Sequence, residues 1–347
     1  MVGGGKDAFI GGVHRIAARL DGQFELVAGA LSSRADIARE SGQALGLADD
    51  RIYIDYAQMA AAEATREDGI DAVAIVTPNN VHYPAVRAFL EAGINVSCDK
   101  PLTSSLGDAR ALAEVAAASS AKFMLTHNYT GYPLMRQARQ MVAAGELGTV
   151  RVVQSEYPQD WLTQEVRNKQ ADWRVDPERA GAGGCIGDIG THAYNLARFV
   201  TGLPLAELSA DLTAFVPGRR VDDNVNMLLR FANGARGALW ASQVSPGNEN
   251  GLALRVYGDK GGLEWVQAQP NRMWFSPFGK PRQLITRGGA TPMGSVQSGA
   301  MVRIPPGHPE GYLEAFATLY AEFAEVIRTG RGGEALPTIE DGVEGMA

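Results

Sequence analysis

The chain is poor in cysteine and contains no long apolar run. Only two cysteines, Cys98 and Cys185, occur among its 347 residues, too few for a disulfide framework. Neither has a second cysteine nearby, so we interpret both as reduced packing residues rather than metal ligands. The longest apolar runs, such as residues 72–77, are strand-sized, whereas a membrane-spanning helix needs about 20 residues. Because nothing resembles a signal peptide either, we expect a cytoplasmic protein.

Clustered positive charge is also missing. The chain has 32 Lys and Arg residues against 39 Asp and Glu residues, a net charge of −7, with both signs spread along its length. A nucleic-acid-binding surface would need clustered Lys and Arg, so we expect no such partner. The content of 45% hydrophobic and 20% charged residues is typical of globular proteins, and the length predicts two domains.

The first half of the chain alternates short apolar runs with helical patterns. Strands are expected at residues 25–31, 72–76, 94–98 and 122–126, and helices at 13–20, 35–45, 82–92 and 106–118. This alternation predicts βαβ units and a parallel sheet covered on both faces. Sheets of this kind bind ligands at the carboxyl ends of their strands.

The pattern changes after about residue 148. A helix is expected at residues 192–201, and strands at 225–231, 235–243, 252–257 and 262–265. Asn233-Gly234 and the glycine-rich run 258–262 are hairpin signals, so we expect antiparallel strands and a second, α+β domain. The predicted domains are residues 1–126 and 127–347. A long loop at 288–306 and an amphipathic helix at 312–328 are expected near the end.

Glycines gather at the start of the chain, between a strand remnant at residues 1–2 and the helix expected from residue 13. Glycines there let backbone amides approach a pyrophosphate at a helix N-terminus, which predicts a phosphate-binding loop with contacts from Gly3, Gly5, Phe9 and Ile10. The spacing is not a clean G-x-G-x-x-G, because five residues separate Gly5 from Gly11. A flexible tail would contain glycines too.

The run after the strand expected at 25–31 indicates which dinucleotide binds. A fold specific for NAD usually places an acidic residue there to bind the ribose diol. Here the run is Ser32, Ser33 and Arg34, and two hydroxyls with a guanidinium suit a 2′-phosphate better. This favours NADP slightly. The alternative is that Arg34 simply points into water.

A polar loop follows the strand expected at 72–76. Pro78 would end the strand, and Asn79 can cap the next helix. At this edge of the sheet the loop would border the nicotinamide ribose, so Thr77, Pro78, Asn79 and His82 are candidate cofactor contacts. A plain strand-to-helix turn is equally consistent with the pattern.

Two further motifs carry chemistry. Asp99, Lys100 and Pro101 follow the strand expected at 94–98, where a lysine would polarise a substrate hydroxyl and stabilise an alkoxide, unless it is a surface lysine. Asp188 and His192 are four residues apart and share one helix face, so the carboxylate can orient the imidazole as a general base. The alternatives are an N-cap Asp beside an ordinary helix-face His, or a metal site, for which a further ligand is lacking.

Together these residues resemble the glucose–fructose oxidoreductase/inositol dehydrogenase family (Gfo/Idh/MocA). Residues 99–101 are similar to its Glu-Lys-Pro signature and residues 188–192 to its D-x-x-x-H motif, in the same order over nearly the whole chain. The resemblance implies an N-terminal Rossmann dinucleotide-binding domain and a C-terminal α/β domain with a large, mostly antiparallel open sheet. It also implies that Lys100 is the central catalytic residue, that His192 transfers the proton, and that Asp188 orients His192 or a substrate hydroxyl.

The sequence departs from the family pattern in several places. Asp99 replaces the family's Glu and, like Lys100 and Asn128, is a candidate cofactor contact. Many relatives carry an Asn-Arg-like pair near residue 128, whereas here Tyr129 and Tyr132 offer a neutral, hydroxyl-bearing wall, so an acidic substrate is not expected. By comparison with the family pattern, we expect most of the first strand to be missing, and residues 336–347 to end within a final helix.

Two other segments are candidates for the substrate pocket. The indole of Trp173 suits the C–H face of a sugar ring and Arg174 could donate to its hydroxyls, although ordinary packing explains them equally well. His308 is better explained as part of a helix entry. Asp222 and Asp223 are expected in a solvated turn.

The sequence therefore predicts an NAD(P)-dependent dehydrogenase acting on a pyranose or inositol-type ring carbinol, with Lys100, Asp188 and His192 as catalytic residues. Substrate contacts are expected from Lys100, Tyr129, Trp173, Arg174, Asp188 and His192. We expect a homodimer or homotetramer formed through the C-terminal sheet. An NAD-dependent glycosidase of the same fold would show no net accumulation of reduced cofactor. A non-catalytic nucleotide-sensing protein is the other alternative, against which the intact Lys100, Asp188 and His192 argue.

Overall fold

The computed structural model describes residues 1–289 and 301–347, which form two compact units. The first unit comprises Met1–His127, Asn168–Ala182 and Phe316–Ala347, and the second comprises Asn128–Arg167 and Gly183–Ala315. The boundary between the units, after His127, lies one residue beyond the expected one. The expected domains, 1–126 and 127–347, were each continuous in sequence, whereas here two later segments belong to the first unit. They return because they bond there: Ala180 O accepts the side-chain amide of Asn79, and Pro337 O accepts the N–H of Leu125.

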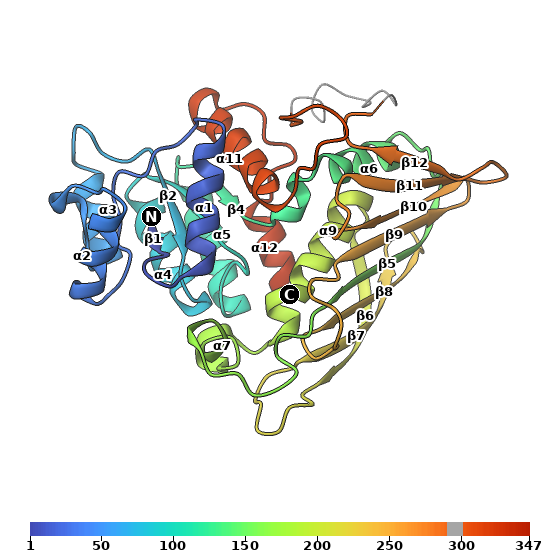
Figure 1. Cartoon of the computed structure of the whole chain (residues 1–347), viewed down its shortest axis with the longest axis horizontal. Helices are drawn as coiled ribbons and strands as arrows, with labels where there is room; N and C mark the ends of the chain where they lie inside the picture. Colours follow the sequence, from blue (N-terminus) through green and yellow to red (C-terminus); the bar gives the residue numbers. More distant parts are fainter. Residues whose placement is uncertain (290–300) are drawn as a thin grey trace. The chain divides into compact units, whose positions relative to one another are not determined.

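The first unit contains a parallel sheet in the order β1-β2-β3-β4 (Figure 1). Its strands are β1 (Val2–Gly3), β2 (Ala72–Val76), β3 (Asn95–Cys98) and β4 (Phe123–Leu125). The helices around it are α1 (Phe9–Leu20), α2 (Ala35–Ala44), α3 (Tyr56–Glu63), α4 (His82–Glu91), α5 (Leu106–Ala118), α7 (Lys169–Asp172), α8 (Pro177–Ala180) and α12 (Ile339–Met346), with most of α11 (Tyr312–Thr329). The βαβ prediction is confirmed.

The strand expected at residues 25–31 is largely wrong. Only two isolated parallel bridges form there, from Ala30 to Val2 and from Gly29 to Ile52. Because β1 has only two residues, this segment finds no partner along which a longer ladder could form. The core beneath the sheet is nevertheless continuous, with Phe89, Val96 and Leu112 fully buried.

The second unit is built on an eight-stranded sheet in the order β12-β11-β10-β9-β5-β8-β7-β6. The strands are β5 (Val150–Pro158), β6 (Leu205–Thr213), β7 (Asn224–Phe231), β8 (Arg236–Ser242), β9 (Ala253–Gly258), β10 (Gly261–Val266), β11 (Arg272–Pro277) and β12 (Gln283–Thr286). Neighbours run antiparallel except β5 and β8, which pair in parallel. The expected large, mostly antiparallel sheet is thus confirmed, including the hairpin at Asn233-Gly234, where Gly234 has φ +90°.

Four of these strands were not expected from the sequence. Strands β6 and β12 lie at the edges of the sheet, and β6 is exposed along nearly its whole length, so it lacks the buried alternation that marks a strand. Strand β5 lies in the middle of the sheet, between β8 and β9, although the β7–β8 and β9–β10 hairpins come later in the chain. Its position depends on pairings remote in sequence, which a local pattern does not reveal.

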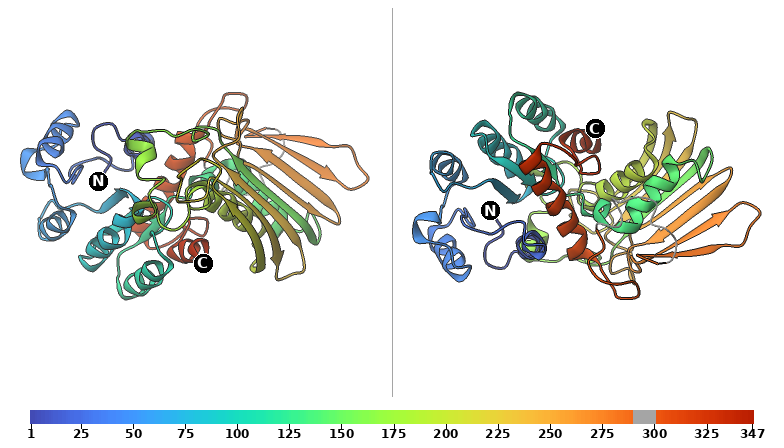
Figure 2. Two further views of the ribbon diagram at one scale, coloured as in Figure 1. Left: turned by 90° about the horizontal axis from the view of Figure 1, so that it is seen from below. Right: turned by 90° about the horizontal axis from the view of Figure 1, so that it is seen from above.

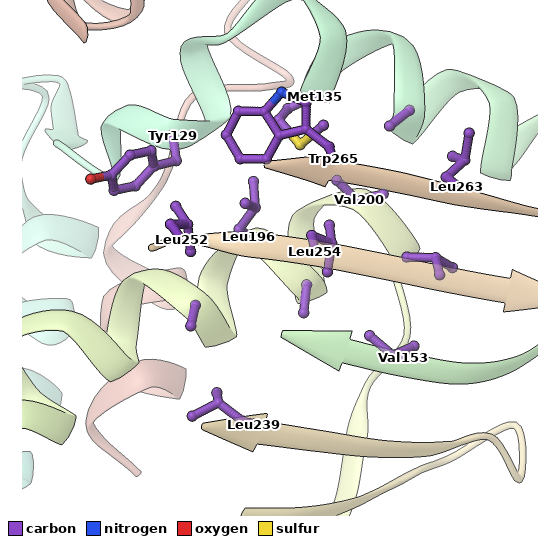
Figure 3. Packing of buried hydrophobic residues seen from close by; sticks show 14 of the residues in the cluster. Tyr129, Met135, Val153, Leu196, Val200, Leu239, Leu252, Leu254, Leu263 and Trp265 are labelled. Carbon is purple, nitrogen blue, oxygen red and sulfur yellow. The ribbon is translucent and has the colours of Figure 1, made fainter. Parts of the chain in front are cut away.

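Helices cover one face of this sheet. Helices α6 (Pro133–Ala143) and α9 (Thr191–Thr201) lie against it in both views of Figure 2. Figure 3 shows side chains from both layers, among them Leu196, Val200 and Leu254, gathered in the core between them. Strand alternation turns Leu228 to the opposite face, where it is 69% exposed.

No helix among the described residues is both long enough and apolar enough to cross a membrane. Of the loop expected at 288–306, residues 290–300 lie outside the described residues. The helix expected at 312–328 is confirmed as α11.

Candidate functional site

The glycine-rich start of the chain is a close backbone contact and not a flexible tail. Gly3 and Gly4 have φ of +76° and +72°, a region that disfavours residues with a side chain. A Cβ on Gly11 would lie 2.4 Å from the Cα of Gly4, and one on Gly5 would lie 2.7 Å from Leu31 O. The backbone of this turn therefore lies so close to Gly11 in α1 that only a hydrogen atom, and no side chain, fits between them.

The start of α1 can hold an anion. The residue before the helix, Ala8, has no capping side chain, and no acidic residue stands in the first turn. The first backbone N–H groups of a helix point outward and favour negative charge. Phe9 is 63% exposed, whereas Ile10 packs partly into the cluster around Met1 and Leu31. Contact of either residue with a cofactor stays a prediction.

Asp36, an acidic residue that the sequence analysis did not consider, lies just after the run expected to select the dinucleotide. Arg34 donates to both carboxylate oxygens of Asp36, at 3.3 Å from Nε and 2.7 Å from Nη2. Both side chains are about two-thirds exposed, and Ser32 Oγ accepts the N–H of Arg34. Arg34 therefore does not simply point into water. The region offers both a guanidinium, which suits a 2′-phosphate, and a carboxylate, which suits a ribose diol.

Two candidate cofactor contacts in the loop after β2, Asn79 and His82, have hydrogen-bond partners within the first unit, and their contact with a cofactor stays a prediction. Asn79 does not cap α4, because its side-chain amide donates to Ala180 O at 2.8 Å. His82 is fully buried, and its Nδ1 and Nε2 lie 2.8 Å from Pro101 O and 3.0 Å from Thr77 O. Burial lowers the pKa of His82. Its ring lies between the end of β2 and the turn after β3. Since a neutral imidazole carries one N–H, it donates to one of these two carbonyls.

The turn after β3 presents Lys100 from a rigid base. The Asp99 carboxylate accepts the N–H of Lys100 and the hydroxyl of Thr126, each at 2.9 Å, and the Lys100–Pro101 peptide is cis. The turn is also held by His82 at Pro101 O. Asp99 was expected to contact the cofactor, but its Oδ1 accepts both hydrogen bonds that hold the turn.

His127 is a neighbour of Lys100 that the sequence analysis did not single out. The imidazole is buried, and burial followed by the charge of Lys100 lowers its pKa to about 3. His127 is therefore neutral at physiological pH. A His directly after the last strand of a parallel sheet is the signal that could have revealed it.

The structure also contains buried polar atoms that suit a bound dinucleotide. Thr77 Oγ1 and Asn128 Nδ2 are buried, and neither has a hydrogen-bond partner within residues 1–289 and 301–347. Buried polar atoms normally have partners, so each is suited to bonding a ligand. Within the first unit, Thr77 Oγ1, the glycine turn and the uncapped start of α1 fit a nicotinamide dinucleotide.

In the second unit, Asp188 lies on a turn wider than an α-helix, and His192 lies in the first turn of the α-helix that follows. Ile186–Gly190 form a π-helical turn, η4, which continues into α9. Gln243 Nε2 donates to Asp188 Oδ2 at 2.8 Å, so Asp188 is not an N-cap. The His192 ring is buried and stands edge-on to Tyr129, with 4.9 Å between ring centroids.

Tyr129 begins a chain of hydrogen-bonded, uncharged hydroxyl and amide groups. Its hydroxyl lies 2.5 Å from that of Tyr157, which donates to Asn250 Oδ1 at 2.8 Å. Gln159 Nε2 donates to the same oxygen at 2.8 Å, and Gln159 Oε1 accepts from Trp161 Nε1 at 3.0 Å. Burial raises the pKa of both tyrosines, which keeps them neutral. Sequence reasoning missed Tyr157 because it missed β5.

Three other expectations need adjustment. Tyr129 and Tyr132 stack in the core, with 6.0 Å between their centroids and with 3% and 2% exposure, so they do not form the expected accessible wall. Arg174 lies over the Trp173 ring at 4.4 Å and donates to Gln170 O, which covers one face of the indole; substrate contact by either residue stays a prediction. His308 is exposed, and its carbonyl accepts from Arg287 at 2.6 Å.

The expectation for Asp222 and Asp223 is wrong. Both side chains are buried, with 9% and 0% exposure, because each carboxylate accepts hydrogen bonds from backbone N–H groups. Asp223 accepts the N–H groups of Phe215 and Val216 and pairs with Arg219 at 3.0 Å. Asp222 bonds to the segment that precedes Asp188.

Comparison with known proteins assigns the family. Residues 1–127 match the oxidoreductase family with an NAD-binding Rossmann fold, and residues 135–264 match the GFO/IDH/MocA C-terminal domain. An uncharacterized oxidoreductase of Bacillus subtilis, YfiI, is 34% identical over 100% of this chain and 91% of its own length. This chain belongs to the Gfo/Idh/MocA family.

Solved structures resemble this member of the family over its whole length. An oxidoreductase from Sinorhizobium meliloti is 56% identical, covers 100% of this chain and 93% of its own, and has a TM-score of 0.92. An inositol dehydrogenase homolog from Azotobacter vinelandii, complexed with NADH and myo-inositol, is 36% identical over 100% and 91% of the two chains, with a TM-score of 0.91. The protein is thus an oxidoreductase of a family whose named members act with NAD(P) on sugars and cyclitols.

Proposed function

We propose that this protein oxidises a ring carbinol of an uncharged cyclitol or pyranose to a ketone, with a nicotinamide dinucleotide as hydride acceptor. The observation that supports this most strongly is the neutral cluster beside His192, in which Tyr129, Tyr157, Asn250 and Gln159 supply hydroxyl and amide groups. Such groups match the alternating donors and acceptors of a polyol, whereas an acidic substrate calls for a guanidinium or ammonium. The likeness to a homolog complexed with NADH and myo-inositol points the same way.

Three residues have separate roles in removing the hydroxyl proton and stabilising the resulting alkoxide. We infer that His192 removes the hydroxyl proton as general base, with Asp188 orienting the imidazole or a substrate hydroxyl. Lys100 supplies positive charge to the developing alkoxide. The bound nicotinamide supplies the hydride acceptor, and the protein supplies orientation and charge.

The cofactor would be held by the first unit and by Asn128. The start of α1 and the turn around Gly3 and Gly5 suit the pyrophosphate, and Thr77 and Asn128 supply otherwise unpartnered polar atoms. Ser32 to Arg34 alone favour NADP, but Asp36 already neutralises Arg34 and would repel a 2′-phosphate. We therefore infer a preference for NAD that depends on Asp36.

The test is the absorbance of reduced nicotinamide when inositols and pyranoses are offered with NAD or NADP. A steady rise with at least one polyol supports the proposal, and His192→Asn serves as the matched inactive control. No rise across the panel, with cofactor binding intact, would reject it. Release of an aglycone from a glycoside without net cofactor reduction would identify a glycosidase instead.

We also propose that two or four copies assemble through the exposed face of the large sheet. Leu228, Trp274 and Leu284 are exposed and lie on the same face of this sheet by strand register. Large apolar side chains exposed on an open sheet face are typical of an interface. Light scattering coupled to size exclusion should report a dimer or tetramer, and Leu228→Lys should reduce its mass. A monomer at micromolar concentration would refute the assembly.

A further inference from the structure

A single residue of the second unit, Asp222, receives three consecutive backbone amides of the segment leading to Asp188. Its Oδ1 accepts the N–H of Gly184 at 2.6 Å, and its Oδ2 accepts that of Ile186 at 2.8 Å. Its carbonyl oxygen accepts the N–H of Cys185 at 2.9 Å. Hydrogen bonds to a carboxylate are stronger than neutral ones, so this clamp anchors the segment firmly.

The clamp leaves the segment no freedom to shift toward β7. A Cβ on Gly184 would lie 2.0 Å from Asp222 O and 2.7 Å from a methyl carbon of Val221. The position is therefore restricted to glycine by contact. Ile186 also begins the π-helical turn, and the N–H of Asp188 donates to Gly184 O at 2.9 Å. The clamp thus reaches Asp188 through one hydrogen bond.

The neighbouring residue connects the clamp to the other side of Asp188. Asp223 O accepts the N–H of Gln243 at 2.9 Å, and the side chain of Gln243 donates to Asp188 Oδ2. Asp222 therefore holds the backbone before Asp188, and Asp223 holds the backbone of Gln243, whose side chain bonds the Asp188 carboxylate.

We propose that Asp222 is a positioning residue for the reaction, which clamps the π-helical turn so that Asp188 and His192 are held in their working orientation. This inference rests on the proposed function. π-Helical turns are rare and, where they occur within helices, are frequent at functional sites. A displacement of about 1 Å at a reacting group can lower a rate about a hundredfold.

The test compares Asp222→Asn with Val200→Ala. Asparagine keeps the size of the side chain but turns an amide N–H₂ toward one of the two backbone N–H groups. Val200 is buried at the far end of α9, so Val200→Ala lowers stability without touching residues 184–186. We expect Asp222→Asn to lower kcat about tenfold to a hundredfold, with an unchanged dissociation constant for NAD and a shifted pH profile of kcat. Val200→Ala should leave the pH profile unmoved.

A second readout does not depend on turnover. The NMR titration of the His192 Cε1 proton should shift in Asp222→Asn and not in Val200→Ala. If the wild type oxidises no polyol, the proposed function fails while this titration still tests the clamp. Should Asp222→Asn not fold, Asp222→Glu keeps the charge but moves the carboxylate, and should give an intermediate shift. An unchanged His192 titration in a folded Asp222 variant would overturn the proposal.

Discussion

The two units hold their functional side chains in different ways. Lys100 stands in a turn directly after β3, and the side chains that hold this turn, Asp99 and His82, are near it in sequence. Asp188 is held by Gln243, 55 residues away, and its turn is clamped by Asp222. The comparison teaches that the lysine site is built from neighbouring strand ends of the parallel sheet, within about 30 residues of Lys100, whereas the histidine site requires the large sheet to be assembled.

The largest expected effect concerns the local side of this comparison. Lys100→Met should lower kcat about a hundredfold to a thousandfold, because the alkoxide loses its nearby positive charge. Lys100→Arg keeps the charge and should retain more activity. Steady-state kinetics with the best polyol, alongside cofactor titration, provide the measurement. Full turnover by Lys100→Met would remove the proposed mechanism.

A second effect appears in stability rather than in rate. The pKa of His127 falls from 6.5 in the unfolded chain to about 3 in the folded protein. The unfolded state therefore binds more protons between these values, and this contribution to stability is complete above pH 6.5 and lost as the pH falls toward 3. Urea unfolding across that window should show a flatter pH dependence for His127→Gln than for the wild type. Identical slopes would contradict the burial of a neutral imidazole.

The link between β2 and the Lys100 turn gives a test within the first unit. His82→Leu leaves the buried carbonyls of Thr77 and Pro101 without this partner and should lower kcat about tenfold. In His82→Gln an amide N–H₂ can donate to both carbonyls, so this variant should recover part of the loss. Equal rates for the two variants would show that hydrogen bonding at this position does not support Lys100.

The matching test in the second unit removes the side-chain partner of Asp188. Gln243→Leu should lower kcat about tenfold, the effect expected when a hydrogen bond to a charged group is lost. Affinity for NAD should not change, because Gln243 belongs to the second unit and the proposed nucleotide site lies mainly in the first. A weakened cofactor affinity with normal kcat would reverse this assignment.

The smallest expected effect concerns cofactor choice. Asp36→Asn removes the carboxylate that pairs with Arg34 and should raise kcat/KM for NADP severalfold relative to NAD. Arg34→Ala should move the ratio in the opposite direction. If neither ratio changes, this exposed pair does not contact the adenosine ribose.

The same contrast explains how far the sequence could be interpreted. Strand β2 and helix α5 were predicted with the observed bounds, because each is a local apolar pattern with a clear start. The turn carrying Lys100 follows from such a strand. Asp222 was assigned to a solvated turn because its partners, Gly184 and Ile186, are remote in sequence. Tyr157 was missed for the same reason, since β5 becomes a central strand only after β8 and β9 pair with it.

The central claim is tested most directly by following the hydrogen that leaves the substrate. Myo-inositol carrying deuterium on its ring carbons would be incubated with the protein and NAD, and the nicotinamide ring analysed by NMR. The account predicts deuterium on the reduced ring, transferred from the oxidised carbon, and no transfer by His192→Asn. Bound cofactor that gains no deuterium from this or any other uncharged polyol of the panel would contradict it.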